Sequence, residues 1–82
     1  MNIKQNKKIL VVSNDAGGAE IVSAYVKNNL DNYSFFCVLG GPAKNIFAKK
    51  GLDKYIIPEN DKEIEKIFKS NDFDFILAST SW

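Results

Sequence analysis

The sequence predicts an α/β unit built on a parallel sheet, and three observations carry this prediction. Four short apolar runs that are typical of buried strands alternate with three segments of helical periodicity. The connections between them are short, and glycine or proline residues mark several of their ends. Such alternation is typical of parallel strands joined by right-handed crossovers. We therefore expect a three-layer, Rossmann-like β-α-β-α-β-α-β unit that forms a single (half) domain over residues 1–82.

The first half of the chain has the clearest pattern. Residues 9–12 (ILVV) form a continuous apolar run, which is typical of a central parallel strand buried on both faces. Apolar residues then recur at helical spacing over residues 19–30, with charged and amide side chains between them. This spacing predicts the first helix. Residues 34–39 (SFFCVL) predict the second strand because they combine aromatic and other strand-favouring residues.

The second half has weaker apolar runs but well-marked helix ends. Pro42 suits the first position of a helix, and Gly51 follows the last turn of that helix. Residues 55–57 (YII) predict a brief third strand that a proline stops. Asn60 resembles the cap of a third helix. Residues 73–78 (FDFILA) predict the fourth strand, so the expected sheet is four-stranded.

The expected strand order places the helices unequally. In the order 3-2-1-4, the first two helices cover one face of the sheet and only the third covers the other. The fourth strand has no helix after it. We therefore expect an incomplete domain that a missing carboxyl-terminal domain, a second copy in a homodimer, or another partner completes. A flavodoxin-like order, 2-1-3-4, is an alternative that would move the binding loops to residues 14–18 and 58–61.

The overall charge disfavours two classes of partner. The 11 basic and 10 acidic residues give a formal net charge of +1, so no sequence-wide field attracts nucleic acid or an anionic membrane. No apolar run approaches the roughly 18 residues of a membrane-spanning helix, and the polar amino terminus lacks a signal-peptide core. We therefore expect a cytoplasmic protein without a membrane span. Its one cysteine agrees with a reducing compartment.

Several kinds of chemistry are excluded by residue type. The chain contains no histidine, which excludes Ser-His and Cys-His catalysis and histidine-bound metals within it. Cys37 lies in the middle of a predicted strand, so we expect an inert core residue. We expect neither a metal site nor a cofactor, and the sequence singles out no catalytic residue.

Three loops at one edge of the predicted sheet are the candidate ligand-binding site. In open α/β sheets, ligands bind beyond the carboxyl ends of the strands, where the strand order switches. The first loop also opens a helix, whose free N–H groups and dipole favour an anion. The candidate residues are Asn14, Asp15, Ala16, Gly17 and Gly18 after the first strand, Gly40 and Gly41 after the second, and Ser79, Thr80 and Ser81 after the fourth.

A purely structural interpretation of these loops stands beside the functional one. Asp15 or Asn14 would then simply cap the helix, and the glycines would make the turn. The first loop has neither the G-x-G-x-x-G pattern of dinucleotide-binding proteins nor the Gly-Lys-Ser/Thr of a Walker A loop. Gly40 and Gly41 would form a tight turn before a helix that starts with proline.

Residues 9–18, 38–47 and 76–82 together resemble the amino-terminal, Rossmann-like half of GT-B type glycosyltransferases and the related sugar-nucleotide 2-epimerases of bacterial polysaccharide biosynthesis. The likeness spans the chain but covers less than half of such an enzyme. It implies that this half receives the acceptor, while an absent carboxyl-terminal domain holds the nucleotide sugar. By this resemblance, residues 15–18, 40–41 and 79–81 line a cleft.

Two functions follow as expectations. The first is an acceptor-side or sugar-phosphate-binding fragment of a glycosyltransferase-like protein, inactive in sugar transfer by itself. The second is a non-enzymatic small α/β module that acts through homodimer or partner contacts. The small-residue loops favour the first, and the incomplete cover of the sheet favours the second.

Overall fold

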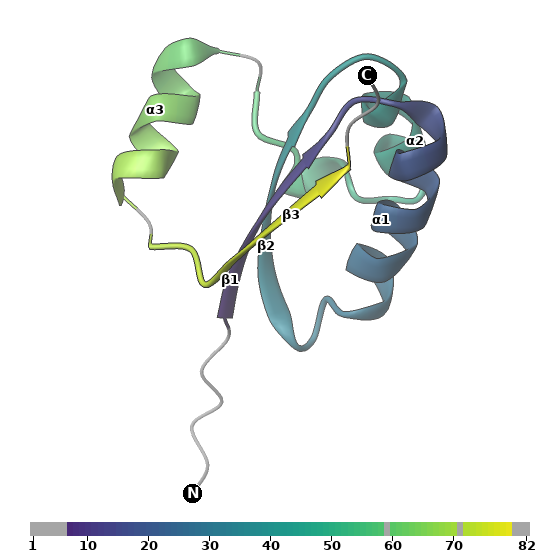
Figure 1. The fold of residues 1–82 in the computed structure, drawn as a ribbon, viewed down its shortest axis with the longest axis horizontal. Helices are drawn as coiled ribbons and strands as arrows, with labels where there is room; N and C mark the ends of the chain where they lie inside the picture. The colour runs from purple at the N-terminus through teal and green to yellow at the C-terminus, as the bar shows by residue number, and fades with distance from the viewer. Residues whose placement is uncertain (1–6, 59, 71, 80–82) are drawn as a thin grey trace, which may run out of the picture.

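The chain folds into a parallel sheet with helices on both faces, as the computed structural model shows (Figure 1). The structure describes residues 7–58, 60–70 and 72–79. The strands are β1 (Lys7–Ser13), β2 (Tyr33–Leu39) and β3 (Phe75–Ser79), in the order β2-β1-β3. The helices are α1 (Ala16–Asn28), α2 (Pro42–Lys49) and α3 (Asp61–Ser70), with a short 3-10 helix η1 (Asp53–Tyr55). The predicted α/β class is confirmed.

The sheet differs from the prediction in one element. In the described part of the chain it has three strands rather than four, because residues 55–57 do not form a strand. Tyr55 belongs to η1, and Ile56 makes only an isolated parallel bridge to Cys37 of β2. The N–H group of Ile57 donates to the Cys37 carbonyl over 2.7 Å. Pro58 follows without an N–H group to donate, so it ends the pairing after one bridge.

The hydrophobic core lies between the sheet and the two helices α1 and α2. Side chains alternate along a strand, so Ile9, Val11 and Ser13 point to this side of β1. The buried apolar cluster is made of Ile9, Val11, Ala19, Val22, Val26, Phe35, Cys37, Leu39, Ala43, Phe47 and Leu52. β1 and β2 supply the buried side chains of the sheet in this layer, and β3 adds the partly buried Leu77.

The predicted start and end of α2 and the predicted start of α3 are confirmed. Pro42 is the first residue of α2, and the preceding Gly41 has a positive φ of 50°. Gly51 follows the helix with a φ of 75°, a conformation that glycine adopts readily. The Asn60 side chain accepts a hydrogen bond from the Lys62 N–H group over 2.9 Å and so caps α3. Both ends of α2 and the start of α3 therefore have local chemical causes.

The opposite face of the sheet is thinly covered. Figure 1 shows α3 on this side, standing away from the strands. Edge-to-face ring contacts link it to the sheet, from Phe68 to Phe73 at 6.1 Å and from Phe73 to Phe36 of β2 at 5.4 Å. Ile76 of β3 is 68% exposed on this face.

Among the described residues, none of the helices combines the length and apolar character needed to cross a membrane.

Candidate functional site

The carboxyl ends of the three strands meet at one edge of the sheet, where the loops after β1 and β2 also lie (Figure 1). Backbone hydrogen bonds fix this arrangement. The Gly40 N–H group donates to the Ser13 carbonyl over 3.0 Å, and the Asn14 N–H group donates to the Ser79 carbonyl over 3.3 Å. The structure therefore brings together candidate residues that are widely separated in the sequence. We call this region the carboxyl edge.

Asp15 caps α1, as the structural interpretation predicted. Its backbone is extended, and its Oδ2 atom accepts a hydrogen bond from the Gly18 N–H group over 2.9 Å. The Asp15 carbonyl accepts from the Ala19 N–H group over 3.0 Å, which starts the helix. A carboxylate at this position also interacts favourably with the helix dipole. The cap uses only one carboxylate oxygen, so Oδ1 has no hydrogen-bond partner among the described residues.

Gly18 is required where the first turn of α1 touches the end of β3. A Cβ atom at this position would overlap the Ser79 hydroxyl group and would lie 2.9 Å from the Ser79 Cβ atom. Gly17 differs, because a Cβ atom there would meet nothing nearer than the Asp15 Oδ2 atom at 3.8 Å. Gly18, but not Gly17, is therefore needed for the close approach of α1 to β3.

Two polar oxygen atoms at the carboxyl edge are buried without a partner in the described part of the chain. They are Ser13 Oγ, in a residue that is 1% exposed, and Asp15 Oδ1. Ser13 lies beside Ser79 in the sheet register, and Asp15 Oδ1 lies close to Gly18. A buried polar group without a partner costs about 1–3 kcal/mol. Both atoms are enclosed by the protein, so a ligand hydroxyl or amide group gains a hydrogen bond to one of them only where the covering loops move aside.

The charge at this edge favours hydroxyl groups over anions. The N–H groups of Ala16 and Gly17 lie in the exposed first turn of α1, where a helix attracts negative charge. The Asp15 carboxylate lies beside them and repels an anion. No lysine or arginine occurs among the candidate residues. A neutral ligand that both donates and accepts hydrogen bonds fits this combination better than inorganic phosphate does.

The remaining candidates divide by position. Asn14, Ala16, Gly17 and Gly41 are exposed at this edge, and Gly40 is half-buried. A Cβ atom on Gly41 would lie 3.1 Å from the Asn14 carbonyl oxygen, so the loops after β1 and β2 are in contact. Thr80 and Ser81 lie outside the described residues.

Ser13 is a site residue that the sequence analysis did not identify. It ends an apolar strand, and its side chain lies on the same face as Ile9 and Val11. The available signal was this alternation, which places a hydroxyl group at the end of a row of buried apolar side chains. The Ser13 hydroxyl group is therefore buried next to the carboxyl edge.

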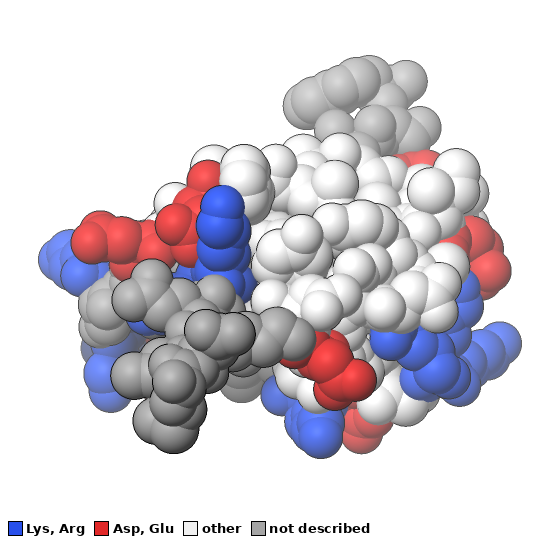
Figure 2. Space-filling model, turned by 90° about the horizontal axis from the view of Figure 1, so that it is seen from below, with Lys and Arg blue, Asp and Glu red and all other residues white. Residues whose placement is uncertain are grey.

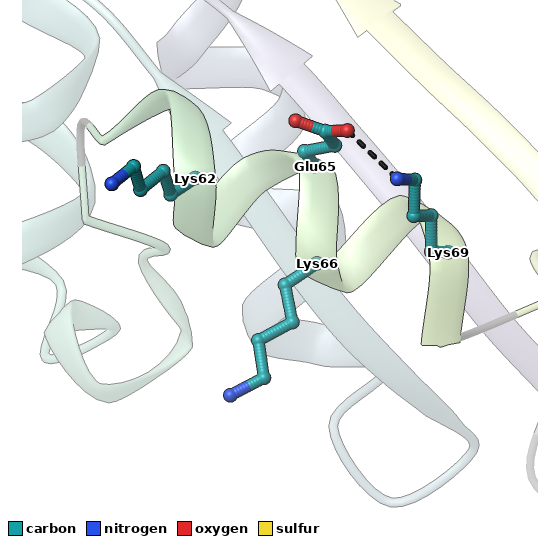
Figure 3. A pocket seen from close by; sticks show the side chains of 4 residues that line it. All are labelled: Lys62, Glu65, Lys66 and Lys69. Atoms are coloured by element: carbon teal, nitrogen blue, oxygen red, sulfur yellow. Dashed lines mark ion pairs between the residues drawn. The ribbon is translucent and has the colours of Figure 1, made fainter.

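A hollow of about 380 Å³ lies along α3, away from the carboxyl edge. Lys62, Glu65, Lys66 and Lys69 line it, and Figure 3 shows that all four project from one helix. Glu65 and Lys69 form an ion pair of 2.8 Å, whereas Lys66 points away from them. Exposed pairs of this kind contribute little to stability. With no second element to converge on a ligand, this hollow is a solvated helix face.

Cys37 is a buried core residue, as the sequence predicted. Its side chain is inaccessible, and burial raises the pKa of the thiol from 9.0 to about 12. The thiolate is the nucleophilic form, so the folded protein holds this cysteine in an unreactive state. Among the described residues, no group of three or more His, Cys, Asp and Glu side chains could hold a metal ion.

Cys37 should resist iodoacetamide at neutral pH in the folded protein and react readily in denaturant. The folded pKa exceeds the unfolded value, so the fold favours the protonated thiol. This contribution to stability is complete below about pH 9 and is lost as pH rises towards about 12. Mass spectrometry of the alkylated protein measures the rate. Equal rates with and without denaturant would contradict the assignment of Cys37 to a closed core.

The fold and the carboxyl edge define a parallel α/β unit with one candidate ligand-binding region. Comparison with models of protein families, with curated proteins and with solved structures finds no match for this chain. The resemblance to the amino-terminal half of GT-B type glycosyltransferases therefore stays a prediction.

Proposed function

We propose that this chain binds hydroxyl groups of a sugar or sugar-phosphate acceptor at the carboxyl edge, as the acceptor-side part of a glycosyltransferase-like protein. The observation that carries the proposal is the pair of unpartnered buried oxygens, Ser13 Oγ and Asp15 Oδ1, beneath the loops at that edge. Another domain would supply the nucleotide sugar, so the chain alone does not transfer sugar. A cytoplasmic setting in bacterial polysaccharide biosynthesis is part of this proposal.

The hydrogen-bonding groups of the carboxyl edge support a polyhydroxylated ligand. A sugar hydroxyl group donates one hydrogen bond and accepts others. Asp15 provides a charged acceptor whose orientation is already fixed by the Gly18 N–H group. The exposed N–H groups of Ala16 and Gly17 provide donors in the same turn. Cap and ligand contacts thus use different oxygens of one carboxylate.

We assign the enclosure of the ligand at the carboxyl edge to a second domain. Small-molecule sites are usually concave and bury most of the ligand. The two hollows described in this structure lie along α3 and beside β3, and neither includes a residue of the carboxyl edge. We also propose that residues 55–57 take the place of a third strand beside β2, so that the four segments follow the order 3-2-1-4. The bridge from Ile56 to the outer side of β2 supports this order.

Backbone amide NMR spectra of the chain, titrated with N-acetylglucosamine, glucose 1-phosphate, UDP-N-acetylglucosamine or inorganic phosphate, test the proposal. With N-acetylglucosamine and glucose 1-phosphate, we expect chemical-shift changes confined to residues 14–18, 40–41 and 79, at a Kd on the order of 1–10 mM. Inorganic phosphate should bind more weakly because Asp15 repels it. Stronger shifts with phosphate alone, or none with any sugar, would contradict a hydroxyl-binding edge.

The Asp15→Asn variant separates binding from folding. Asparagine also caps helices, so the fold should persist with a cost of only a few tenths of a kcal/mol. Loss of the charged acceptor should raise the Kd for the sugar by about 5–10-fold. The matched control is Asp53→Asn, which removes one exposed carboxylate in η1 and should leave the Kd unchanged. Sugar transfer by the chain alone would also contradict the proposal.

A further inference from the structure

We propose that the free edge of β3 and the adjoining side of α1 bind a second copy of this chain, with the two β3 strands paired antiparallel about a two-fold axis. This interface goes beyond ligand binding at the carboxyl edge. We call it the apolar flank, and its residues are Ile21, Tyr25, Phe75, Ile76 and Leu77. The two sheets would then become one continuous sheet.

The first argument is the unprotected edge of β3. This strand pairs with β1 and ends the sheet order β2-β1-β3 in the described part of the chain. Soluble proteins usually protect such an edge with lysine, proline, a bulge or an inward-pointing charge. The sequence of β3, FILAS, carries no charged residue and no proline. Among the described residues, no strand pairs with the outer side of β3.

The second argument is the exposed apolar surface next to this edge. Ile21 is 75% exposed, Tyr25 42%, Phe75 53% and Ile76 68%. Tyr25 and Phe75 line a hollow of about 340 Å³ that Leu77 also borders. Ile21 lies one turn from Tyr25 on α1. Figure 2 shows the molecule from below, with charged side chains of both signs around an area of other residues. Exposed apolar side chains that border one hollow are typical of interfaces.

The third argument is that β3 is complementary to itself in size. Antiparallel pairing centred on Leu77 places Phe75 opposite Ser79 of the second copy, and Ile76 opposite Ala78 of the second copy. Phe75 and Ile76 therefore each face a small side chain, and the two copies of Leu77 meet on the axis, which suits side chains packed across neighbouring strands. A two-fold axis applies the same match twice, as an isologous interface requires.

The fourth argument is charge. Lys7 lies at the amino end of the apolar flank, with its Nζ atom 5.3 Å from the centre of the Phe75 ring. Asp15 lies at the other end, where Gly18 brings α1 against Ser79. Antiparallel pairing brings Lys7 towards Asp15 of the second copy. Asp74 lies at the same end as Lys7, and its carboxylate accepts a hydrogen bond from the Lys8 N–H group over 2.8 Å. Charged residues therefore lie at the ends of β3, and none lies within its apolar centre.

A specific dimer would cover a modest share of this chain's surface. Specific interfaces bury about 800 Å² per partner, which is about one-seventh of the accessible surface of 5604 Å². A different partner with a charged edge strand would match neither the side-chain sizes along β3 nor the positions of Lys7 and Asp15.

Sedimentation velocity from about 10 μM to about 1 mM tests the proposal. We expect a monomer–dimer equilibrium within this range. Ile76→Lys adds a charge to an exposed side chain on the edge and should raise the dimer Kd at least tenfold while the folded NMR spectrum persists. The control, Asn45→Lys, adds the same charge to an exposed position of α2 and should leave the Kd unchanged.

The register has its own measurement. In a mixed sample of isotope-labelled and unlabelled protein, we expect intermolecular NOEs from the Phe75 ring to the β-protons of Ser79, and from Ile76 to Ala78. A wild-type monomer at about 1 mM, or a dimer that Ile76→Lys leaves intact, would overturn the proposal. Sugar titration of the monomeric Ile76→Lys variant tests the carboxyl edge separately.

Discussion

Replacing Gly18 by alanine should destabilise the fold by about 2–3 kcal/mol. The new methyl group would overlap the Ser79 hydroxyl group and would lie 2.9 Å from Asp15 Oδ1 and from Ser79 Cβ. Rotation of the serine side chain relieves only the first of these contacts, so α1 and β3 must move apart. Urea denaturation followed by circular dichroism measures the free energy of unfolding. For a chain of this size, the expected loss lowers Tm by roughly 10 °C or more.

Two further variants isolate the cause of this loss. Gly17→Ala makes the same chemical change one residue earlier, where the nearest atom to the new methyl group is 3.8 Å away. It should be neutral or should stabilise by up to about 1 kcal/mol, because alanine favours the helix. Combining Gly18→Ala with Ser79→Gly should recover about 1 kcal/mol or more relative to additivity. Equal losses for the two glycine variants would show that α1 and β3 are not in close contact.

The central part of the fold was predictable because its signals are local. A continuous apolar run indicated β1, and helical spacing indicated α1. Pro42 and Gly51 indicated the ends of α2 through their own backbone preferences. Each of these features depends on a few neighbouring residues, so no knowledge of tertiary contacts was needed.

The predicted third strand failed because strand pairing depends on distant residues. The sequence Tyr-Ile-Ile has the composition of a strand, but Tyr55 is part of a 3-10 turn. Cys37 then provides one bridge before Pro58 ends the pairing. A strand needs several consecutive backbone pairs with a neighbour, and three apolar residues next to a proline cannot supply them. Amino-acid composition alone therefore predicted one strand more than the described part of the chain contains.

The candidate site was predicted by location and only partly by chemistry. The rule for open α/β sheets pointed to the loops after β1 and β2, which do meet at the carboxyl edge. It could not show that Asp15 uses one oxygen for the helix cap and leaves the other unpartnered among the described residues. It also passed over Ser13, whose burial follows from side-chain direction within a paired strand. Both properties arise from packing, which sequence spacing does not define.

The largest expected effect in the core is that of Phe47→Ala. Phe47 is fully buried and lies in α2 among the residues of β1, β2 and α1 that form the core. Removal of a buried phenylalanine side chain costs about 3–5 kcal/mol. At roughly 0.05–0.15 kcal/mol per residue, the whole chain has a stability of only about 4–12 kcal/mol. We therefore expect urea denaturation followed by circular dichroism to show the loss of at least about a quarter of the stability of the chain.

The matched variant Phe68→Ala should cost only about 0.5–1.5 kcal/mol. Phe68 is the same residue type and also lies in a helix, but it is 50% exposed and contacts Phe73 edge to face at 6.1 Å. Alanine also favours the helix, which offsets part of the lost contact. The contrast follows from the arrangement of the layers, because α1 and α2 enclose the core while α3 stands apart from the sheet (Figure 1). If both variants lost the same stability, α3 would have to close on the sheet in solution, and the thinly covered face would be part of the core.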